Sequence, residues 1–438
     1  MTSSARVIVV SIDGFRPDAV TTLGPGILPN FYRLRSEGAF TDNARTDFHY
    51  TETLPNHTSM ITGRPVSGEC GHGLTVNFGN ENTNLHVDGY KASMFDVAHD
   101  HGLSTGLYSV KSKFGAFSGS YNEVNGAPDL TGEDNGRNKI DTLKVNITDD
   151  LSVARYLNGL QLLKWDLSML HIGLPDIVGH SQGWSLNPTS SYMNAIITVD
   201  DYLGKILEAI ETNGAFNGST NLIVTADHGG AAIATRTHID PELPENYTIP
   251  FYVWGPGVKA GADLYELNPD LADPGTGRPE FHGLDKPIRN GMVGNLALGI
   301  LGLPPIPGSC FNVSQQLRVS DPTGFQDEYP WLDPDDDTNG NGFSNFFDYA
   351  IGAEPHGPHR PDLMPRMIRN EWSVNYRTNT TDVVARFEIS TDFTTWWPLF
   401  KDVTYIPISS EETTGGKRVQ IQIPMIARKS IYRMNFQR

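Results

Sequence analysis

The stretch "RVIVVSIDG" at residues 6–14 decides the fold class, because its apolar run is unbroken and then ends in polar residues. Such a run predicts a parallel strand that is buried on both faces and has reactive side chains at its carboxyl end. Similar runs lie at 104–110, 167–173, 221–229 and 249–257, and helical patterns lie between them at 90–102 and 190–214. We therefore predict an α/β fold, with a mostly parallel sheet sandwiched by helices.

The chain has 438 residues, which is too long for one ordinary core and predicts several domains. The α/β pattern closes at 289–309 with a helical segment and a Pro/Gly-rich terminator. Alternating apolar and polar residues near the end of the chain predict a small all-β domain. We predict an α/β domain at 1–320, a linker with an acidic loop at 321–355, and a small β domain at 356–438.

Composition narrows the class of protein. Hydrophobic residues make up 38% and charged residues 19%, as expected for a folded soluble protein. The net charge of −18 disfavours binding to a nucleic-acid duplex or to an anionic membrane. We predict no membrane span, because the sequence has no apolar run of the required length. The two cysteines, Cys70 and Cys310, match no zinc-ribbon spacing, and the sequence leaves their pairing open.

Carboxylates and imidazoles occur in four separated pieces, each at a predicted strand end or helix start. A single residue of this kind is usually part of a turn or a hydrogen-bonded core residue. Four such pieces at one edge of a sheet instead predict a metal site, because His and Asp ligate Zn²⁺ where Cys is absent. The residues are Asp13, Asp176 with His180, Asp227 with His228, and His238.

The segment "TETLPNHTSMITG" (51–63) places Thr53 in front of a short helical pattern, and alone it would read as a helix cap. Together with the four pieces it resembles the alkaline phosphatase superfamily, most closely the type I phosphodiesterase/nucleotide pyrophosphatase branch. The resemblance covers about residues 5–318 and rests on the ordered set Asp13, Thr53, Asp176-x3-His180, Asp227-His228 and His238. It implies an alkaline phosphatase-like fold for this domain.

The resemblance implies two zinc ions. One would be held by Asp176, His180 and His238, and the other by Asp13, Asp227, His228 and the Thr53 hydroxyl. Asn77, in "HGLTVN", matches the family's Asn that donates to a phosphoryl oxygen. The alternative third ligand of the first ion is His282, in "FHGLD". We favour His238, because the apolar strand run 249–257 follows it as the family pattern requires.

The implied activity is that of a two-zinc phosphoric ester hydrolase, a phosphodiesterase that acts on a small phosphoester through a phosphothreonine intermediate on Thr53. A Thr hydroxyl is a weak nucleophile that metal coordination activates, and the N-terminal end of a helix favours phosphate. A phosphonate or phosphomonoester hydrolase with the same site is the main alternative. A sulfatase is disfavoured, because it needs Cys or Ser where Thr53 stands. A non-catalytic surface binding protein is disfavoured by the intact ligand set.

The acidic segment around 337–348 matches the twelve-residue calcium loop pattern, with Asp in place of Glu at the last position. A plain solvated linker is the alternative. We predict one structural Ca²⁺ that stiffens the joint between the domains. Its ligands would be Asp337, Asn339, Asn341, Asn345, Asp348 and the Phe343 carbonyl.

Three further expectations concern surface residues and location. Lys111 and Lys113, in "SVKSKF", favour a solvated loop, although either lies where it would reach a substrate anion. The tryptophan pair 396–397 favours a core or interface position over sugar binding. The chain enters a strand within six residues of its first Met, so we expect that a signal peptide has been removed. Together with a calcium loop, this predicts a periplasmic or extracellular protein, whose oligomeric state the sequence leaves open.

Overall fold

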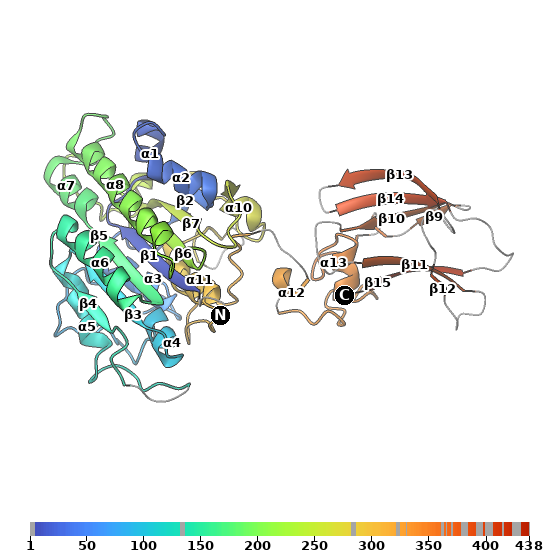
Figure 1. The fold of residues 1–438 in the computed structure, drawn as a ribbon, viewed down its shortest axis with the longest axis horizontal. Coiled ribbons are helices and arrows are strands. Elements are labelled where there is room, and N and C mark those ends of the chain that lie inside the picture. Colours follow the sequence, from blue (N-terminus) through green and yellow to red (C-terminus); the bar gives the residue numbers. More distant parts are fainter. Residues whose placement is uncertain are drawn as a thin grey trace. The chain divides into compact units, whose positions relative to one another are not determined.

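The computed structural model describes two compact units, Met1–Ser320 and Asp321–Arg438. The described residues are 5–131, 136–281, 286–320, 325–329, 331–360, 363–364, 366–368, 371–377, 384–390, 397–398, 406–413, 416–422 and 431–437. Figure 1 shows the helices and strands of both units, coloured along the sequence. A linker at 321–355, separate from the β domain, stays a prediction.

An eight-stranded sheet organises the first unit, with the order β4-β3-β5-β1-β6-β7-β2-β8. The strands β1, β3, β4, β5 and β6 run parallel, whereas β7 is antiparallel to both β6 and β2. The predicted mostly parallel α/β sheet is therefore confirmed. The strands are β1 (Arg6–Ile12), β2 (Ala39–Arg45), β3 (Thr105–Ser109), β4 (Thr142–Lys144), β5 (Leu167–Ile172), β6 (Thr220–Thr225), β7 (Thr248–Trp254) and β8 (Ala262–Asp263).

Helices cover both faces of this sheet (Figure 1). On one face α8 contacts α1, α2, α6 and α7, and on the other α11 contacts α3 and α4. The helices are α1 (Pro17–Leu23), α2 (Pro29–Glu37), α3 (Thr53–Thr62), α4 (Met94–Asp100), α5 (Gly115–Ser120), α6 (Asp149–Leu163), α7 (Leu174–Gln182), α8 (Ser191–Thr212), α9 (Pro244–Tyr247), α10 (Leu264–Leu267) and α11 (Val293–Ile300). Two 3₁₀ helices, η1 (Ser112–Phe114) and η2 (Asn290–Met292), complete the unit.

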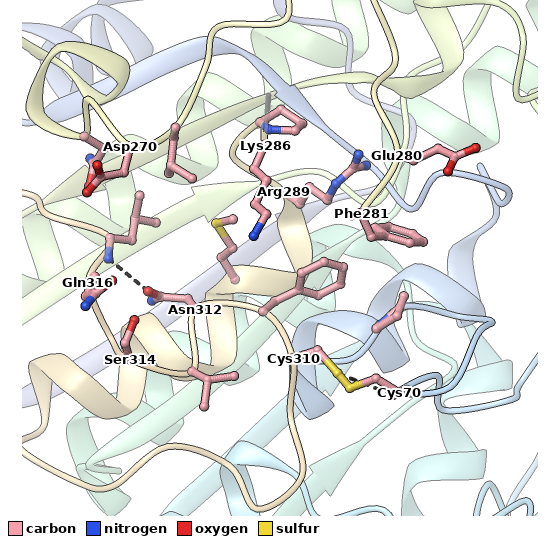
Figure 2. Close-up of a pocket in the computed structure, with 18 of the residues that line it drawn as sticks. Cys70, Asp270, Glu280, Phe281, Lys286, Arg289, Cys310, Asn312, Ser314 and Gln316 are labelled. Atoms are coloured by element: carbon pink, nitrogen blue, oxygen red, sulfur yellow. Dashed lines mark hydrogen bonds between the residues drawn. A yellow bond between two sulfur atoms is a disulfide. The ribbon is translucent and has the colours of Figure 1, made fainter. Parts of the chain in front are cut away.

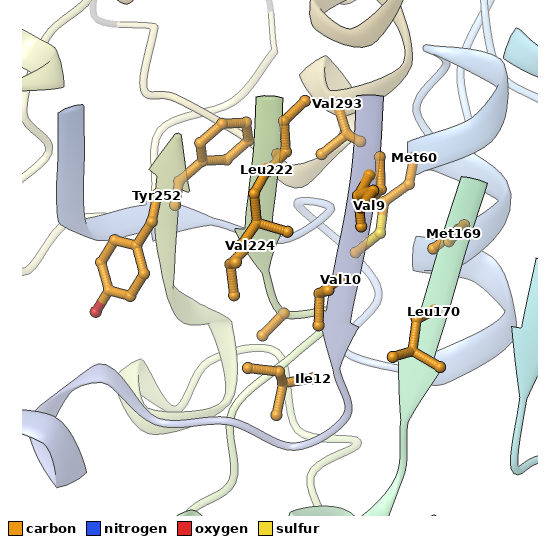
Figure 3. Close-up of a cluster of buried hydrophobic side chains, with 14 of the residues drawn as sticks. Val9, Val10, Ile12, Met60, Met169, Leu170, Leu222, Val224, Tyr252 and Val293 are labelled. Atoms are coloured by element: carbon orange, nitrogen blue, oxygen red, sulfur yellow. The ribbon is translucent and has the colours of Figure 1, made fainter. Parts of the chain in front are cut away.

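The central strand β1 is buried on both faces. Val7, Val9, Val10 and Ile12 are completely inaccessible to solvent. Neighbouring residues of a strand point to opposite faces, so a sheet with helices on both sides requires an unbroken apolar run. In Figure 3 the side chains of Val9 and Val10 leave β1 on different sides, within one buried hydrophobic cluster. The apolar run therefore fixes β1 in the middle of the sheet, and its carboxyl end in the middle of the site.

The second unit contains two small antiparallel sheets, with the orders β13-β14-β10-β9 and β12-β11-β15. Its described helices are α12 (Phe325–Glu328) and α13 (Asn345–Ala350), where Phe325, Tyr329, Phe346 and Tyr349 form an aromatic cluster. The β-rich C-terminal region agrees with the sequence prediction. The strands are β9 (Arg366–Ile368), β10 (Glu371–Tyr376), β11 (Val384–Ser390), β12 (Trp397–Pro398), β13 (Ile406–Thr413), β14 (Gly416–Gln422) and β15 (Ile431–Gln437).

Candidate active site

Three adjacent parallel strands bring the predicted residues to one edge of the sheet. β1 lies between β5 and β6, and Asp13 directly follows β1. Gly14 has a φ of 69°, and a side chain there would meet the Asp176 backbone at 2.9 Å. Glycine is therefore needed for the turn that follows Asp13, since it allows α7 to approach so closely. α7 carries Asp176 and His180 after β5, and Asp227 and His228 follow β6.

One group of candidate ligands consists of Asp176, His180 and His238. Asp176 Oδ1 lies 3.3 Å from His180 Nε2 and 3.5 Å from His238 Nε2. Each imidazole uses its other nitrogen on the backbone: Nδ1 of His180 bonds to the Arg236 carbonyl and Nδ1 of His238 to the Thr51 carbonyl. A carbonyl can only accept, so both Nδ1 atoms carry a hydrogen, and Nε2 is the ring atom that faces the carboxylate.

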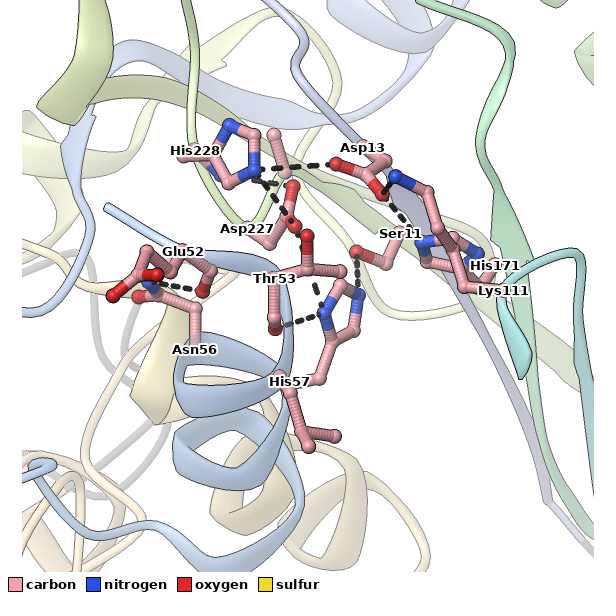
Figure 4. A network of polar contacts seen from close by, with 12 residues as sticks. Ser11, Asp13, Glu52, Thr53, Asn56, His57, Lys111, His171, Asp227 and His228 are labelled. Atoms are coloured by element: carbon pink, nitrogen blue, oxygen red, sulfur yellow. Dashed lines mark hydrogen bonds and ion pairs between the residues drawn. The ribbon is translucent and has the colours of Figure 1, made fainter. Parts of the chain in front are cut away.

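A second group consists of Asp13, Asp227 and His228 (Figure 4). His228 Nε2 lies 3.2 Å from Asp13 Oδ1 and 3.4 Å from Asp227 Oδ2. Its Nδ1 donates to the Gly229 carbonyl at 2.8 Å, so Nε2 again faces carboxylates. The imidazoles of His228 and His238 stack at 3.5 Å between ring centroids, which places the two groups side by side.

Four atoms of these groups are buried without a hydrogen-bond partner among the described residues: Asp13 Oδ1, Asp176 Oδ1, Asp227 Oδ2 and His228 Nε2. Buried polar atoms are rarely left unpaired unless an ion or water satisfies them. Ligands bound tetrahedrally at zinc distances of about 2.0–2.1 Å lie about 3.4 Å from one another. The observed nitrogen–oxygen separations of 3.2–3.5 Å match this spacing, so the residues fit zinc.

Burial and mutual charge perturb these groups strongly. Burial raises the pKa of Asp13, but the charge of Lys111 and the adjacent His171 and His228 imidazoles outweigh it, leaving this pKa well below its usual range. Burial and the nearby Asp13 charge raise the pKa of Asp227 well above its usual range. Burial lowers the pKa of His228, yet Asp227 and Asp13 together raise it to about 9. The carboxylates therefore need a cation at this edge of the sheet.

Thr53 is the first residue of α3 and is 1% exposed. Figure 4 shows its side chain at the start of the helix, directed toward Asp227. The first backbone N–H groups of a helix have no intrahelical partner and favour an anion at this end. His57 anchors the turn, since its Nδ1 bonds to the Thr53 carbonyl at 2.7 Å and its Nε2 to Ser11 Oγ at 2.8 Å.

Asn77 lies against the same end of α3. Its Oδ1 accepts hydrogen bonds from the Leu54 backbone N–H at 3.0 Å and from Lys113 Nζ at 2.8 Å. Because both contacts use the oxygen, the Nδ2 donors of Asn77 face away from the protein contacts that fix the side chain. The arrangement suits the predicted role of an amide donor at a phosphoryl oxygen.

The sequence interpretation missed two residues of the site. Lys111 was expected in a solvated loop, and this was wrong: its Nζ lies 2.5 Å from Asp176 Oδ2 and 3.1 Å from Asp13 Oδ2. The reason is that β3 pairs with β5, which brings the residues after β3 to the same edge. His171 Nε2 donates to Asp13 Oδ2 at 3.2 Å, and its Nδ1 lies 3.1 Å from Ser109 Oγ. The sequence feature that could have identified His171 is a histidine within a largely apolar strand run.

The predicted calcium loop folds around two carboxylates. Asp348 Oδ2 accepts from Asn339 Nδ2 at 2.9 Å and Asn341 Nδ2 at 2.8 Å. Asp337 accepts from the backbone N–H of Asn341 and Gly342 at 3.0 and 2.8 Å. The Asn339 and Asn341 amides therefore meet Asp348 through their nitrogens, while their oxygens accept from backbone N–H groups.

Asn345 of the same loop is bonded elsewhere. Its Nδ2 donates to the Asp333 carbonyl at 2.7 Å and to Thr338 Oγ1 at 2.9 Å. The Phe343 N–H donates to Asn341 Oδ1, which closes the turn. The structure therefore brings Asp337, Asn339, Asn341 and Asp348 together and leaves the Asn345 side chain apart from them.

His282 and Trp396 lie outside the described residues, so the structure does not test the predictions made for them. Trp397 begins β12. Cys70 and Cys310, whose pairing the sequence left open, form a disulfide. Over the part of the chain that the structure describes, no helix has both the length and the apolar character needed to cross a membrane.

Two known proteins each match slightly more than half of this chain. Ectonucleotide pyrophosphatase/phosphodiesterase family member 1 of Rattus norvegicus is 28% identical over 243 residues, which cover 52% of this chain and 24% of that relative. Bis(5'-adenosyl)-triphosphatase enpp4 of Xenopus laevis is 24% identical over 261 residues, covering 56% of this chain and 52% of the relative. The chain thus matches between a quarter and about half of the length of these relatives.

Among solved structures, murine ectonucleotide pyrophosphatase/phosphodiesterase 5, an inactive variant in complex with AMP, superposes with a TM-score of 0.49 and 17% identity. The superposition covers 72% of this chain and 99% of that chain. The family model described as type I phosphodiesterase / nucleotide pyrophosphatase matches residues 7–272, which include the complete set of candidate zinc ligands. The chain therefore belongs to the type I phosphodiesterase/nucleotide pyrophosphatase family.

Proposed function

We propose that this protein is a two-zinc phosphoric ester hydrolase, a phosphodiesterase that acts through a phosphothreonine intermediate on Thr53. The observation that carries the proposal is the fixed orientation of three imidazoles. His180, His228 and His238 each bond to a backbone carbonyl through Nδ1 and direct Nε2 at a carboxylate oxygen. Backbone contacts of this kind typically set the tautomer and direction of metal-binding histidines.

The ligand assignment follows the two groups. Asp176, His180 and His238 would hold one zinc ion. Asp13, Asp227 and His228 would hold the other together with the Thr53 hydroxyl, and Asp176 also lies within ligand reach of Asp13 and His228. When bound, the two ions supply Lewis acidity, which lowers the pKa of the Thr53 hydroxyl and neutralises charge on a phosphoryl group.

The chain's own residues then account for the two displacements. Thr53 Oγ1 attacks phosphorus, the P–O bond to the leaving alcohol or nucleotide breaks, and the phosphoryl group becomes esterified to Thr53. Water attacks the phosphothreonine in the second step, which releases phosphate or its monoester and returns the hydroxyl. Asn77 Nδ2 donates to an equatorial oxygen, where charge accumulates, and the positive end of the α3 dipole favours the same anion.

The substrate would be a small phosphoester. The names of the two relatives point to nucleotides, and a nucleoside pyrophosphate or phosphodiester is therefore the first class to test. The same groups would serve a phosphomonoester or a phosphonate, since nothing in the two ligand groups contacts the leaving group. Rates on bis-p-nitrophenyl phosphate, p-nitrophenyl phosphate and p-nitrophenyl phenylphosphonate, measured side by side, separate these classes.

The Thr53→Ala variant tests the nucleophile. Turnover of bis-p-nitrophenyl phosphate should fall at least about 10³-fold. Zinc content, measured by atomic absorption, should stay near that of the parent, because six other ligands remain. Thr58→Ala is the matched control: Thr58 lies in the same helix and donates to the Leu54 carbonyl at 2.8 Å. Turnover by Thr53→Ala within tenfold of the parent would remove Thr53 as the nucleophile.

Two further parts of the proposal lie outside this centre. We propose that Asp337, Asn339, Asn341 and Asp348 bind one structural Ca²⁺, with the Phe343 carbonyl as a further ligand. Support comes from the twelve-residue loop pattern and from the proximity of the Asn339 and Asn341 side chains to Asp348. We also propose a periplasmic or extracellular location, supported by the Cys70–Cys310 disulfide, because disulfides persist mainly in oxidising compartments.

A further inference from the structure

A cavity of about 550 Å³ lies at the C-terminal end of α3, at the opposite end of that helix from Thr53 (Figure 2). The helix has 10 residues, so about 15 Å of helix separates the two ends. The Gly63 carbonyl at the helix end accepts from the N–H groups of Cys310 and Phe311, at 2.7 and 2.9 Å. The volume of the cavity is typical of a small-molecule site. None of its described lining residues is a candidate zinc ligand.

The walls of the cavity are largely apolar. Phe281 and Phe311 meet edge to face, with 5.5 Å between ring centroids, and the Cys70–Cys310 disulfide closes one side. Such a surface excludes water and favours an apolar ligand body. The apolar lining residues are Leu271, Phe281, Met292, Phe311, Val313 and Leu317.

The cations among the lining residues are Lys286, Arg289 and Arg318. Figure 2 shows the exposed Lys286 side chain reaching into the middle of the cavity beside Arg289. Arg289 is 2% exposed, donates to the Thr46 and Pro279 carbonyls, and lies over the Phe281 ring at 4.8 Å. Within the described ranges, Lys286 and Arg289 have no carboxylate at ion-pair distance, and the Asp47 charge acts on Arg289 from farther away.

The remaining polar groups fit the same charge pattern. Burial lowers the pKa of Arg289 to about 10, so it stays charged at neutral pH. The Asn312 Oδ1 accepts from the Leu317 N–H at 2.9 Å, while its Nδ2 is buried without a partner among the described residues. The acidic lining residues are exposed, and Figure 2 shows Glu280 pointing away from Lys286. Among the charged lining residues Arg289 alone is buried, so the charge inside the cavity is positive, and Asn312 adds a donor.

We propose that this cavity binds an amphipathic organic monoanion, with its carboxylate or phosphate head at Lys286 and Arg289 and its apolar body against Phe281, Met292 and Phe311. A single anionic head satisfies both cations, and one unbranched chain fills the apolar part without burying a second charge. The inference is independent of the proposed hydrolytic activity, because it uses no residue of the zinc groups.

Decanoate is the probe, and isothermal titration calorimetry of the full zinc-loaded chain is the measurement. We expect one saturable site, with decanol binding at least about tenfold more weakly, as a charge-assisted hydrogen bond implies. Lys286→Gln should weaken decanoate binding by about tenfold for the same reason. Val313→Trp should block the cavity. Val313 is an exposed residue at the rim, so this change should leave folding intact. Lys144→Gln, at an exposed lysine of β4, is the matched control and should bind as the parent does.

Removal of zinc with a chelator separates this site from the zinc centre, since decanoate bound to zinc would be lost with the metal. We expect decanoate binding to be unchanged by the chelator. Three results would overturn the proposal: absence of saturable binding up to the solubility of decanoate, equal binding by Lys286→Gln and the parent, or loss of decanoate binding with the metal.

Discussion

Lys111 Nζ donates to Asp176 Oδ2 at 2.5 Å and lies 3.1 Å from Asp13 Oδ2, so one ammonium bridges a carboxylate from each candidate zinc group. Both carboxylates are fully buried, and Lys111 is 19% exposed. Burial lowers the pKa of Lys111, but Asp13 and Asp176 raise it above its usual range, so the ammonium stays charged. Lys111 thus supplies part of the positive charge that this edge of the sheet requires.

We predict that Lys111→Gln destabilises the metal-free protein much more than the zinc-loaded protein. Without metal, removing Lys111 leaves two buried carboxylates facing each other, which costs about 3 kcal/mol. With zinc bound, the ions neutralise those carboxylates. Urea unfolding with and without chelator measures the difference, and Lys144→Gln is the exposed control. Equal losses in both states would show that Lys111 does not act on the shared charge.

Asn77→Asp should lower kcat/KM on bis-p-nitrophenyl phosphate by about 10²-fold, a typical loss for one donor at a transition-state oxygen. The aspartate retains the oxygen that accepts from Leu54 N–H and Lys113 Nζ, but it loses the amide donor. Stability should therefore change little, whereas Asn77→Ala should lose both rate and the contact that fixes the helix start. If Asn77→Asp is as active as the parent, Asn77 donates nothing to the reacting phosphoryl group.

Chelation should abolish turnover, and zinc should restore it more fully than calcium or magnesium. The physical reason is the donor set, because imidazole and carboxylate suit zinc, whereas calcium prefers oxygen ligands alone. His180→Ala provides a gentle test, since the His180 side chain is 45% exposed and its loss leaves no large cavity. Zinc content of this variant should fall by about one ion per chain. Full activity in the presence of chelator would contradict the metal assignment.

Part of the candidate site could be predicted from the sequence. The apolar run of β1 and the polar residues after β1 and β6 were readable, because a buried parallel strand needs apolar side chains on both faces. The same reasoning located Asp13 and the Asp227–His228 pair. Lys111 and His171 were not recovered, since their contacts depend on β3 and β1 both pairing with β5. The spacing of residues in the sequence does not show which strands are neighbours in the sheet.

The disulfide also depends on contacts that sequence spacing does not show. Cys70 and Cys310 are 240 positions apart, and only the packing of the loop after α3 against the loop after α11 brings them together. The Nδ1 contacts of the candidate ligands are also invisible in sequence, because their acceptors are backbone carbonyls such as those of Thr51 and Arg236.

Removing the disulfide with Cys70→Ser and Cys310→Ser should lower the free energy of unfolding by about 2–4 kcal/mol. The crosslink closes a long loop, since its cysteines are 240 residues apart, and so it restricts the unfolded chain strongly. Urea unfolding of the parent under oxidising and reducing conditions is the control, because reduction should reproduce the loss. A double variant as stable as the oxidised parent would show that the bond is dispensable for the fold.

The last prediction concerns His72, which is buried behind α3. Its Nδ1 accepts from the Leu74 N–H at 3.1 Å, and its Nε2 bonds to the Pro55 carbonyl at 3.2 Å. An N–H can only donate and a carbonyl can only accept, so the ring is held neutral. Burial lowers the pKa of His72 to about 3, far below the value of about 6.5 expected in the unfolded chain.

Between these two values the unfolded chain binds a proton at this site that the folded protein does not, so stability is lost as the pH falls below about 6.5. His72 alone should contribute a slope of about 1.4 kcal/mol per pH unit. His72→Gln keeps a donor for the Pro55 carbonyl but does not titrate. Urea unfolding of the chelated proteins at pH 7, 6 and 5 should therefore show the variant less stable at pH 7 and its deficit shrinking as the pH falls. Parallel stability curves would contradict the neutral, buried state of His72, since only a group with equal pKa values in the folded and unfolded chains leaves the slope unchanged.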